Sequence, residues 1–287
     1  MFAATFLLWG GCKHTRAPLL EVPFQPRNPT ELAGVLKEMA VRRAAIRTVV
    51  TRLDLVFYDH VKNRKLGLNG FLFGGADGDM RLRISNGDAV VMDLSYRGNE
   101  VSLYLPKRER FFRGSRKEVL ESNGNILALL AHVGTVADLF FPRLGMKLDA
   151  IGPARSELGF DLVTAAETEG GVRRETRRLY ISRMEPVCSR LVVLDRTEHA
   201  MGSVVYADYR FPAPSGSSKP DAAPQPVHPR QVTLSTADNE RALEMTVQEI
   251  ILQEAPIPKA KFELNPPAEL PIRSLSEQLK SSKGLWD

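Results

Sequence analysis

The stretch MRLRISNGDAVVMDLSYRGNEVSLYL, residues 80–105, decides the fold of this chain. Apolar and polar residues alternate along it, and short polar segments at residues 85–88 and 97–100 interrupt the alternation. Alternation places successive side chains on opposite faces of a strand, and Asn and Gly accept the positive φ angles of tight hairpin turns. The stretch therefore predicts an antiparallel meander with one apolar face, which another part of the chain must cover.

The composition is that of a folded protein with a sizeable core. The chain has 287 residues, of which 43% are hydrophobic and 25% charged, enough for one large domain or two small ones. The net charge of +5 and the isoelectric point near 9.2 are mildly basic. This balance favours anionic partners such as lipid headgroups. It is far from the concentrated positive charge of a dedicated nucleic-acid-binding protein, so no nucleic-acid partner is expected.

The amino terminus carries an export signal. Residues 2–9 form an apolar run too short to cross a bilayer, and Gly10, Gly11 and Cys12 follow it before the polar residues 13–16. Two small residues before a cysteine resemble the lipobox of bacterial lipoproteins, which implies cleavage before Cys12 and acylation of that residue. We expect residues 1–11 to be a lipoprotein signal peptide and residues 12–29 to be a lipid-anchor site and flexible tether. An ordinary cleaved signal and an unprocessed terminus are the alternatives.

Two amphipathic segments are candidates for the cover. Asn28 can cap a helix that begins at Pro29, with Glu31 reaching back to the cap. A second helix is expected over residues 124–141, and Pro142 ends it. Each helix has one apolar face, so we expect both to lie across the apolar face of residues 80–105.

Further strands are predicted on both sides of the meander. Their patterns occupy residues 48–58, 66–73, 158–165, 172–184, 190–195, 202–211, 231–235 and 242–253. Residues 212–230 contain six prolines and no periodicity, so we expect a mobile connection within one domain. A short edge strand is expected within residues 260–270, before a weakly helical, mobile end. The chain is thus α+β and mainly β, with about eleven antiparallel strands.

A cluster of charge follows the meander. Residues 107–117, KRERFFRGSRK, contain six basic side chains. Lys107, Arg108, Arg110 and Arg113 are the candidates for contact with anionic headgroups of lipids or glycolipids. The alternative is an ordinary solvated surface, which most charge runs form.

Five stretches mark the order of helix, strands, meander, second helix and returning strands. They are residues 70–84, GFLFGGADGDMRLRI, 101–115, VSLYLPKRERFFRGS, 206–211, YADYRF, 231–235, QVTLS, and 261–267, KFELNPP. In these stretches and in this order the chain resembles the LolA/LolB-like family of outer-membrane lipoprotein-sorting proteins. The resemblance implies a strongly curved, unclosed half-barrel over residues 30–267 with helices covering its concave face, and a tail at residues 268–287. It also implies an apolar cavity that binds acyl chains or lipoproteins.

The resemblance makes candidates of apolar side chains on the strands and the second helix. The expected cavity lining is Leu53, Leu55, Phe57, Leu82, Ile84, Leu103, Leu105, Ile126, Leu130 and Val133. The alternative is that these residues fill an ordinary core, which the sequence does not separate from a cavity.

The expected function is that of a lipid-anchored carrier or acceptor for acyl chains or lipoproteins. It would reside in the envelope of a Gram-negative-type bacterium. Lys13 stands after Cys12 in place of an inner-membrane retention Asp, which favours the outer membrane facing the periplasm. The alternative is a non-catalytic interaction or envelope-stress sensor lipoprotein on the same scaffold, with other envelope proteins as partners.

Catalytic and metal-binding patterns are not found in the sequence. The five histidines are scattered, and no Cys stands at metal-ligand spacing. The nucleophile-elbow, phosphate-loop and dinucleotide-binding motifs are missing as well. We therefore expect no enzyme, no metal and no cofactor. Cys188 is expected to be a small buried side chain, and His132 a surface or internally hydrogen-bonded histidine.

Overall fold

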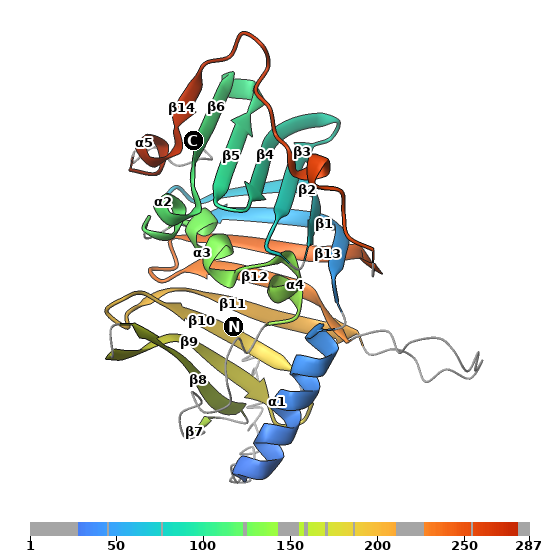
Figure 1. The fold of residues 1–287 in the computed structure, drawn as a ribbon, viewed down its shortest axis with the longest axis vertical. Helices are drawn as coiled ribbons and strands as arrows, with labels where there is room; N and C mark the ends of the chain where they lie inside the picture. The colour runs from blue at the N-terminus through green and yellow to red at the C-terminus, as the bar shows by residue number, and fades with distance from the viewer. Residues whose placement is uncertain are drawn as a thin grey trace, which may run out of the picture.

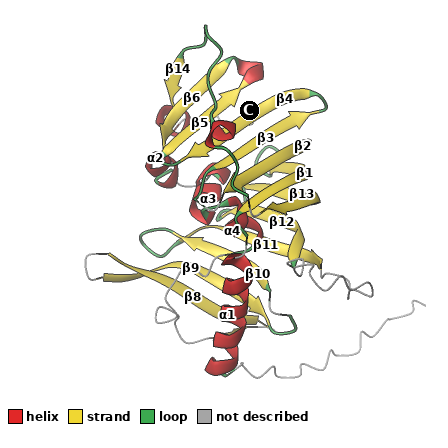
Figure 2. Ribbon diagram, turned by 45° about the vertical axis from the view of Figure 1, so that its right-hand side comes forward, coloured by secondary structure: helices red, strands yellow, loops and turns green. Residues whose placement is uncertain are grey.

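A computed structural model describes ten stretches of the chain and places them in one curved sheet with helices against it (Figures 1 and 2). The described residues are 28–44, 46–75, 77–122, 125–142, 155–157, 160–169, 172–185, 187–210, 227–253 and 255–280. The expected signal peptide, Cys12 and nearly all of the expected tether lie outside the described residues, as do residues 212–226 of the proline-rich connection.

The described strands form one open sheet. Its fourteen strands follow the order β14-β6-β5-β4-β3-β2-β1-β13-β12-β11-β10-β9-β8-β7. Neighbours pair antiparallel except β14, which pairs in parallel with β6. Figure 2 shows the sheet bent into a half-barrel with helices in its hollow. The expectation of a mainly β, strongly curved half-barrel is confirmed, and the additional strands are β6, β7 and β14.

The bounds of the elements follow the chain. The strands are β1 (Thr48–Asp59), β2 (Arg64–Gly75), β3 (Met80–Asn86), β4 (Ala89–Arg97), β5 (Glu100–Leu105), β6 (Arg110–Ser115), β7 (Arg155–Glu157), β8 (Phe160–Glu169), β9 (Val172–Ser182), β10 (Cys188–Leu194), β11 (Ala200–Arg210), β12 (His228–Thr236), β13 (Arg241–Gln253) and β14 (Ile272–Ser274). The helices are α1 (Pro29–Ala44), α2 (Arg116–Leu120), α3 (Ile126–Val133), α4 (Val136–Phe140), α5 (Leu275–Lys280) and the 3-10 turns η1 (Pro106–Arg108) and η3 (Lys259–Phe262).

The meander of residues 80–105 forms as predicted. Leu82 of β3 pairs with Leu94 of β4, which pairs with Leu103 of β5, so these side chains share one buried face. Gly87 and Gly98 have positive φ angles of 58° and 56° in the two turns. A residue with a Cβ is strained there, which is why the sequence has glycine at both turns.

Helix α1 begins as predicted but lies in another place. The backbone nitrogen of Glu31 donates to Oδ1 of Asn28 at 2.8 Å, and that of Asn28 donates to Oε2 of Glu31 at 3.3 Å, which completes the expected capping box. The helix lies beside β10 and β11 (Figures 1 and 2) and does not cover the meander. Its carboxyl end is joined by a short loop to β1, at the centre of the sheet, so it extends over one side only.

The prediction of a single helix over residues 124–141 is wrong. The chain forms α3 and α4, with Gly134 between them at a φ of +106°. Asn125 caps α3 by accepting a hydrogen bond from the nitrogen of Ala128 at 2.7 Å. Helix α3 packs against β10 to β13. It meets the meander where the hydroxyl of Tyr96 on β4 donates to the carbonyl oxygen of Leu127 at 3.2 Å.

The charged segment after the meander contains a strand and a short helix. In β6, Phe111 and Phe112 are both buried, one on each face of the sheet. Ser115 then caps α2 with a capping box to Glu118. Basic residues on both sides of the two phenylalanines break the apolar and polar alternation of a strand. The sequence therefore does not indicate that residues 110–120 form a strand and a helix, as they do in the structure.

The chain past residue 253 departs from the expected order. Phe262 is buried in the turn η3, and the short strand is β14, beyond the expected range of 260–270. Prolines at 266, 267 and 271 remove the backbone donors that an earlier strand needs. Helix α5 follows with Leu275 fully buried, so ordered structure continues into the expected tail. Likewise His228–Arg230, expected in the mobile connection, begin β12.

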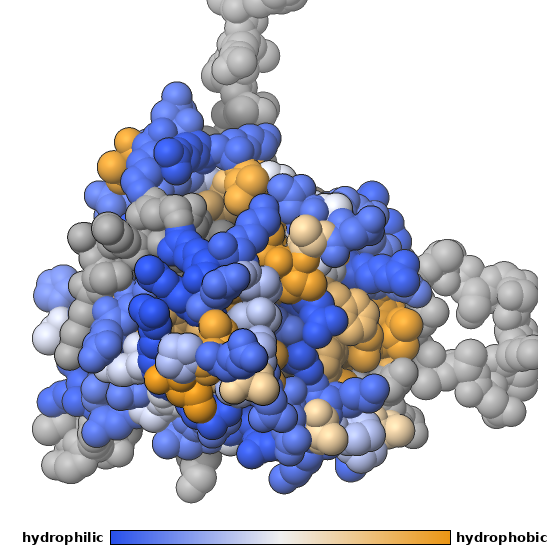
Figure 3. All heavy atoms as spheres, turned by 90° about the horizontal axis from the view of Figure 1, so that it is seen from above, coloured by the Kyte–Doolittle hydropathy of each residue, from blue (hydrophilic) through white to orange (hydrophobic). Residues whose placement is uncertain are grey.

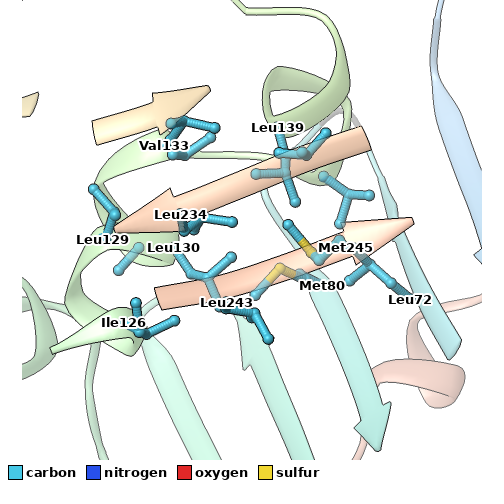
Figure 4. Packing of buried hydrophobic residues seen from close by; sticks show 14 of the residues in the cluster. Leu72, Met80, Ile126, Leu129, Leu130, Val133, Leu139, Leu234, Leu243 and Met245 are labelled. Atoms are coloured by element: carbon cyan, nitrogen blue, oxygen red, sulfur yellow. The ribbon is translucent and has the colours of Figure 1, made fainter. Parts of the chain in front are cut away.

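One hydrophobic cluster joins sheet and helices. Figure 4 shows Ile126, Leu129 and Leu130 of α3 lying over Leu234 of β12 and Leu243 of β13. All of them are buried members of this cluster, which extends from β1 to β13 and includes α1 residues such as Leu32 and Leu36. Burial of apolar area at this scale is the main favourable term in folding. Among the described residues, no helix has both the length and the apolar character needed to cross a bilayer.

Candidate ligand cleft on the concave side

The ten residues predicted to line a cavity come together in the structure. They lie on β1, β3, β5 and α3, and every one of them is buried in the same hydrophobic cluster. Ile126, Leu130 and Val133 belong to the helix that covers the concave face (Figure 4). The cleft that opens to solvent near this cluster is lined by other residues, contributed by α1, α4 and the β10 to β12 side of the sheet.

Two arginines hold the carboxyl end of α3. Nη2 of Arg116, at the start of α2, donates to the carbonyl oxygens of Ala131 at 3.2 Å and Gly134 at 2.8 Å. Nη2 of Arg177, on β9, donates to the carbonyl oxygen of His132 at 2.8 Å. The last carbonyls of a helix lack partners within it and carry partial negative charge, so guanidinium groups stabilise them. Helix α3 is thereby attached to both sides of the half-barrel.

The start of α4 is tied to the end of α1 by a buried ion pair. Thr135 and Asp138 form the capping box of α4. Nε of Arg43 donates to Oδ1 of Asp138 at 2.9 Å, while Nη2 donates to Oγ1 of Thr135 at 2.8 Å and Nη1 to the carbonyl oxygen of Ile46 at 3.1 Å. The two charged side chains are only 7% and 5% exposed. Each guanidinium nitrogen has a partner, which a buried charge requires.

An open cleft lies beside this ion pair. Its lining is Met39, Arg42 and Arg43 of α1, Phe140, Phe141 and Pro142 at the end of α4, and Val187, Cys188, Tyr209 and Val227 from the sheet and its loops. The hollow measures about 400 Å³, counted with the solvent space at its mouth. Most of the described wall is apolar, and the charged residues within this described part are two arginines, the mixture found in small-molecule sites.

Cys188 and Tyr209 give the cleft two neutral polar groups. Sγ of Cys188 donates to the carbonyl oxygen of Arg190 at 3.2 Å, and burial raises the pKa of the thiol to about 12. The hydroxyl of Tyr209 donates to the carbonyl oxygen of Cys188, and burial raises its pKa well above the ordinary value. Both groups are therefore uncharged at neutral pH. The expected burial of Cys188 is confirmed.

Tyr206, on the same strand as Tyr209, has a buried hydroxyl without a partner. Among the described residues no atom forms a hydrogen bond with this oxygen. Burial, with smaller effects from nearby Cys188 and Tyr209, raises the pKa of Tyr206 well above its ordinary value. A buried donor without an acceptor costs free energy, so this hydroxyl lowers the stability of the fold.

His132 is internally hydrogen-bonded, as one of the two expectations had it. Its Nε2 lies 3.1 Å from the carbonyl oxygen of Leu120. Burial lowers the pKa of His132, the Leu120 contact opposes this, and the nearby Arg177 and Arg116 lower the pKa further. Within the described stretches, no three His, Cys, Asp or Glu side chains gather as a metal-ligand group.

The four basic headgroup candidates lie at the other end of the sheet, on η1 and β6 (Figure 1). Lys107 is exposed, and Arg108, Arg110 and Arg113 are partly buried. Nε of Arg113 lies 3.7 Å from Oε1 of Glu100, and its guanidinium lies 5.6 Å from the ring centroid of Phe111. Seen from this end, the surface is mainly hydrophilic with small separate apolar groups (Figure 3).

The cleft is not evident in the sequence, because its walls come from segments that are far apart along the chain. Arg43 and Asp138 stand 95 residues apart, and nothing in either local sequence names the other as partner. One signal was available: Thr135 followed by Asp138 three residues later is a capping-box pattern, which predicts a helix start at that point. It would have divided the expected second helix correctly.

Comparison of the fold with solved structures gives distant likenesses. A protein domain from Vibrio parahaemolyticus described as outer membrane lipoprotein-sorting has a TM-score of 0.51 at 10% identity, over 82% of this chain and 97% of that one. A LolA superfamily protein from Nitrosomonas europaea has a TM-score of 0.52 at 10% identity, over 80% of this chain and 97% of that one. No protein-family model matches the sequence. No curated protein matches it either. The expected resemblance is confirmed at the level of the fold, which is the LolA-like half-barrel.

Proposed function

We propose that this protein binds acyl chains of lipids or lipoproteins on the concave side of the half-barrel, as a non-catalytic carrier or acceptor. The observation that carries the proposal is the open, mostly apolar cleft between α1, α4 and β10 to β11. It adjoins the apolar cluster that includes the ten predicted lining residues. An acyl chain that enters the cleft leaves water for apolar contacts, at a gain of about 0.8 kcal/mol per buried methylene.

The proposal includes a lipid anchor at Cys12 and residence at the outer membrane, facing the periplasm. One acyl chain holds a protein only marginally to a bilayer, whereas two or more hold it stably. Lys107, Arg108, Arg110 and Arg113 would then meet anionic headgroups of the membrane, at the end of the sheet remote from the cleft. Metabolic labelling with palmitate tests the anchor: the unchanged protein is expected to be labelled and Cys12→Ala is not. Equal labelling of both proteins would refute it.

Lipid binding is tested with the full chain carrying Cys12→Ala, so that bound lipid is not its own anchor. After incubation with vesicles of bacterial phospholipid, native mass spectrometry is expected to show protein with added lipid mass. Val187→Trp fills the cleft wall and should reduce this fraction several-fold. Val205→Trp, on the exposed face of β11, is the matched control and should not. A protein that takes up no lipid would overturn the proposed function.

A second function is favoured by one specific observation. The ten residues predicted to line a cavity pack into one cluster and do not form the wall of the cleft. With its interior filled in this way, the half-barrel would serve as a scaffold for an interaction or envelope-stress sensor lipoprotein, with the basic end at β6 as a contact surface. Absence of lipid uptake in the experiment above, with the fold intact by circular dichroism, would favour this function.

A further inference from the structure

We propose that the cleft selects single-chain amphiphiles with an anionic head, and that Arg42 is the residue that binds the head. This inference rests on the proposed function and adds a ligand class to it. Three features of the cleft support it: its size, the absence of acidic residues from the described part of its lining, and the different states of its two arginines.

The size of the cleft favours one chain. The hollow of about 400 Å³ includes solvent space at its mouth, so the enclosed part is smaller. A lipid with several acyl chains needs more room than the described walls provide. A single chain can lie against Met39, Phe140, Phe141 and Val187.

The charge of the cleft favours an anion. Among the residues that the structure describes, its lining contains Arg42 and Arg43 and no Asp or Glu. The polar groups Cys188 and Tyr209 stay neutral because burial raises the pKa of both. No described lining residue therefore supplies negative charge at neutral pH. Asp138 balances the charge of Arg43, so the attraction for an anionic head comes from Arg42.

The two arginines differ in what they can still bind. All three guanidinium nitrogens of Arg43 are engaged by Asp138, Thr135 and Ile46, so Arg43 is a fixed part of the wall. Arg42 pairs through one nitrogen with Glu38, one turn earlier on α1, and both side chains are partly exposed at 36% and 51%. A guanidinium has five N–H donors, so Arg42 keeps donors for a carboxylate or phosphate.

Glu38 then acts as a competitor. It stands one turn before Arg42 and outside the cleft lining, and it occupies Arg42 when no ligand is bound. An exposed pair of this type is weak, so an anionic head can take the place of Glu38 at little cost. Removing the carboxylate of Glu38 should therefore strengthen the binding of anions, while removing the charge of Arg42 should weaken it.

The test uses the full chain with Cys12→Ala and three ligands with the same chain length, below their aggregation concentrations: dodecanoate, dodecyl phosphate and the neutral monododecanoylglycerol. Affinities are measured by isothermal titration calorimetry in the parent protein, Arg42→Gln, Glu38→Gln and Arg47→Gln. Arg47 is an exposed cation on the loop after α1, outside the cleft lining, and serves as the matched control.

The parent protein should bind at least one anionic ligand about tenfold more tightly than the neutral one. Arg42→Gln should abolish this preference without changing affinity for the neutral ligand, Glu38→Gln should increase it, and Arg47→Gln should leave it unchanged. A preference for dodecanoate alone points to free fatty acids, and one that includes dodecyl phosphate points to lysophospholipid-like heads. Equal affinity for neutral and anionic ligands, or equal effects of Arg42→Gln and Arg47→Gln, would overturn this inference alone. Failure of all three ligands to bind would overturn the proposed function with it.

Discussion

At the scale of single residues, the concave interior is organised by which polar groups have partners. Arg43, Arg116 and Arg177 each donate hydrogen bonds from a buried or partly buried guanidinium to acceptors at the ends of helices α3 and α4. Tyr209 donates to the backbone of Cys188. Tyr206 is the exception among the buried tyrosines of β11. Hydroxyl groups of the same residue type, three positions apart, should therefore contribute oppositely to stability.

Replacement of the two tyrosines by phenylalanine tests this difference. Tyr209→Phe should lower the free energy of unfolding by about 1 kcal/mol because it removes a hydrogen bond. Tyr206→Phe should leave the free energy unchanged or raise it, because no partner is lost and a buried hydroxyl is removed. Urea unfolding of both variants measures the effect. A larger loss for Tyr206→Phe than for Tyr209→Phe would show that its hydroxyl has a partner after all.

His132 should make stability depend on pH. Its pKa in the fold lies below the ordinary value of 6.5, so the unfolded chain binds a proton before the folded chain as the pH falls. Stability is thus unaffected by His132 above about pH 7 and decreases as the pH falls through about 6.5 toward the folded pKa. His132→Gln can still donate to the carbonyl of Leu120 and does not titrate. Between pH 7.5 and 5 the free energy of unfolding should therefore fall less steeply in this variant than in the parent protein. An equally steep fall in both proteins would contradict a lowered pKa of His132.

At the scale of elements, the break between α3 and α4 positions the cleft. Gly134 at a φ of +106° turns the chain so that Thr135 can cap α4 and Asp138 can face Arg43. A Cβ at residue 134 would lie 3.1 Å from Oδ2 of Asp138, in addition to the strained backbone. One glycine therefore controls both the helix start and the buried ion pair.

Two glycine-to-alanine variants separate this role from general helix propensity. Gly134→Ala should destabilise the protein by about 1–3 kcal/mol, the usual cost of a side chain in a sparsely populated backbone region. Gly34→Ala, within α1 where an added Cβ meets no atom within 4 Å, should stabilise it by about 0.5–1 kcal/mol. The melting temperatures of both variants, measured by thermal unfolding, give the comparison. Equal shifts of the melting temperature would refute the special role of Gly134.

Elements with regular patterns could be predicted from the sequence, and irregular ones could not. The meander alternates cleanly, and Asn28 with Glu31 has the full capping pattern, so both are confirmed. Strand β6 does not show the alternating pattern, because Phe111 and Phe112 are neighbours in sequence and both are buried, on opposite faces of the strand. The cleft could not be predicted, because Arg43, Phe140 and Cys188 meet only through the path of the whole chain.

At the scale of the whole molecule, the carboxyl-terminal segment connects strands β2 to β4 with the edge of the sheet at β14. It crosses from Phe262, whose ring centroid lies 5.3 Å from that of Phe73, to the edge strand β14 and then to Leu275. Leu275 belongs to the main cluster and packs so closely that an added Cβ on Gly114 would lie 2.8 Å from its own Cβ. The expectation of a mobile end thus gives way to a structural role for this residue.

Leu275→Ala should lower the free energy of unfolding by about 2–5 kcal/mol, because it leaves a cavity at the end of the cluster. Ile272→Ala, three residues earlier and exposed on β14, should change it by less than about 0.5 kcal/mol. Denaturant unfolding of both variants gives the comparison. If the two substitutions have equal effects, Leu275 does not anchor the segment.

The position of β1 at the centre of the sheet has a consequence for the order of assembly. Residues Thr48–Asp59 pair on one side with β2, which follows directly, and on the other with β13, Arg241–Gln253. During synthesis β1 therefore waits with an open edge while nearly two hundred further residues are made. An open edge invites pairing with other chains, and contacts this distant in sequence form slowly. A newly made chain of this kind is therefore exposed to pairing with other chains until its penultimate strand, β13, joins the two halves.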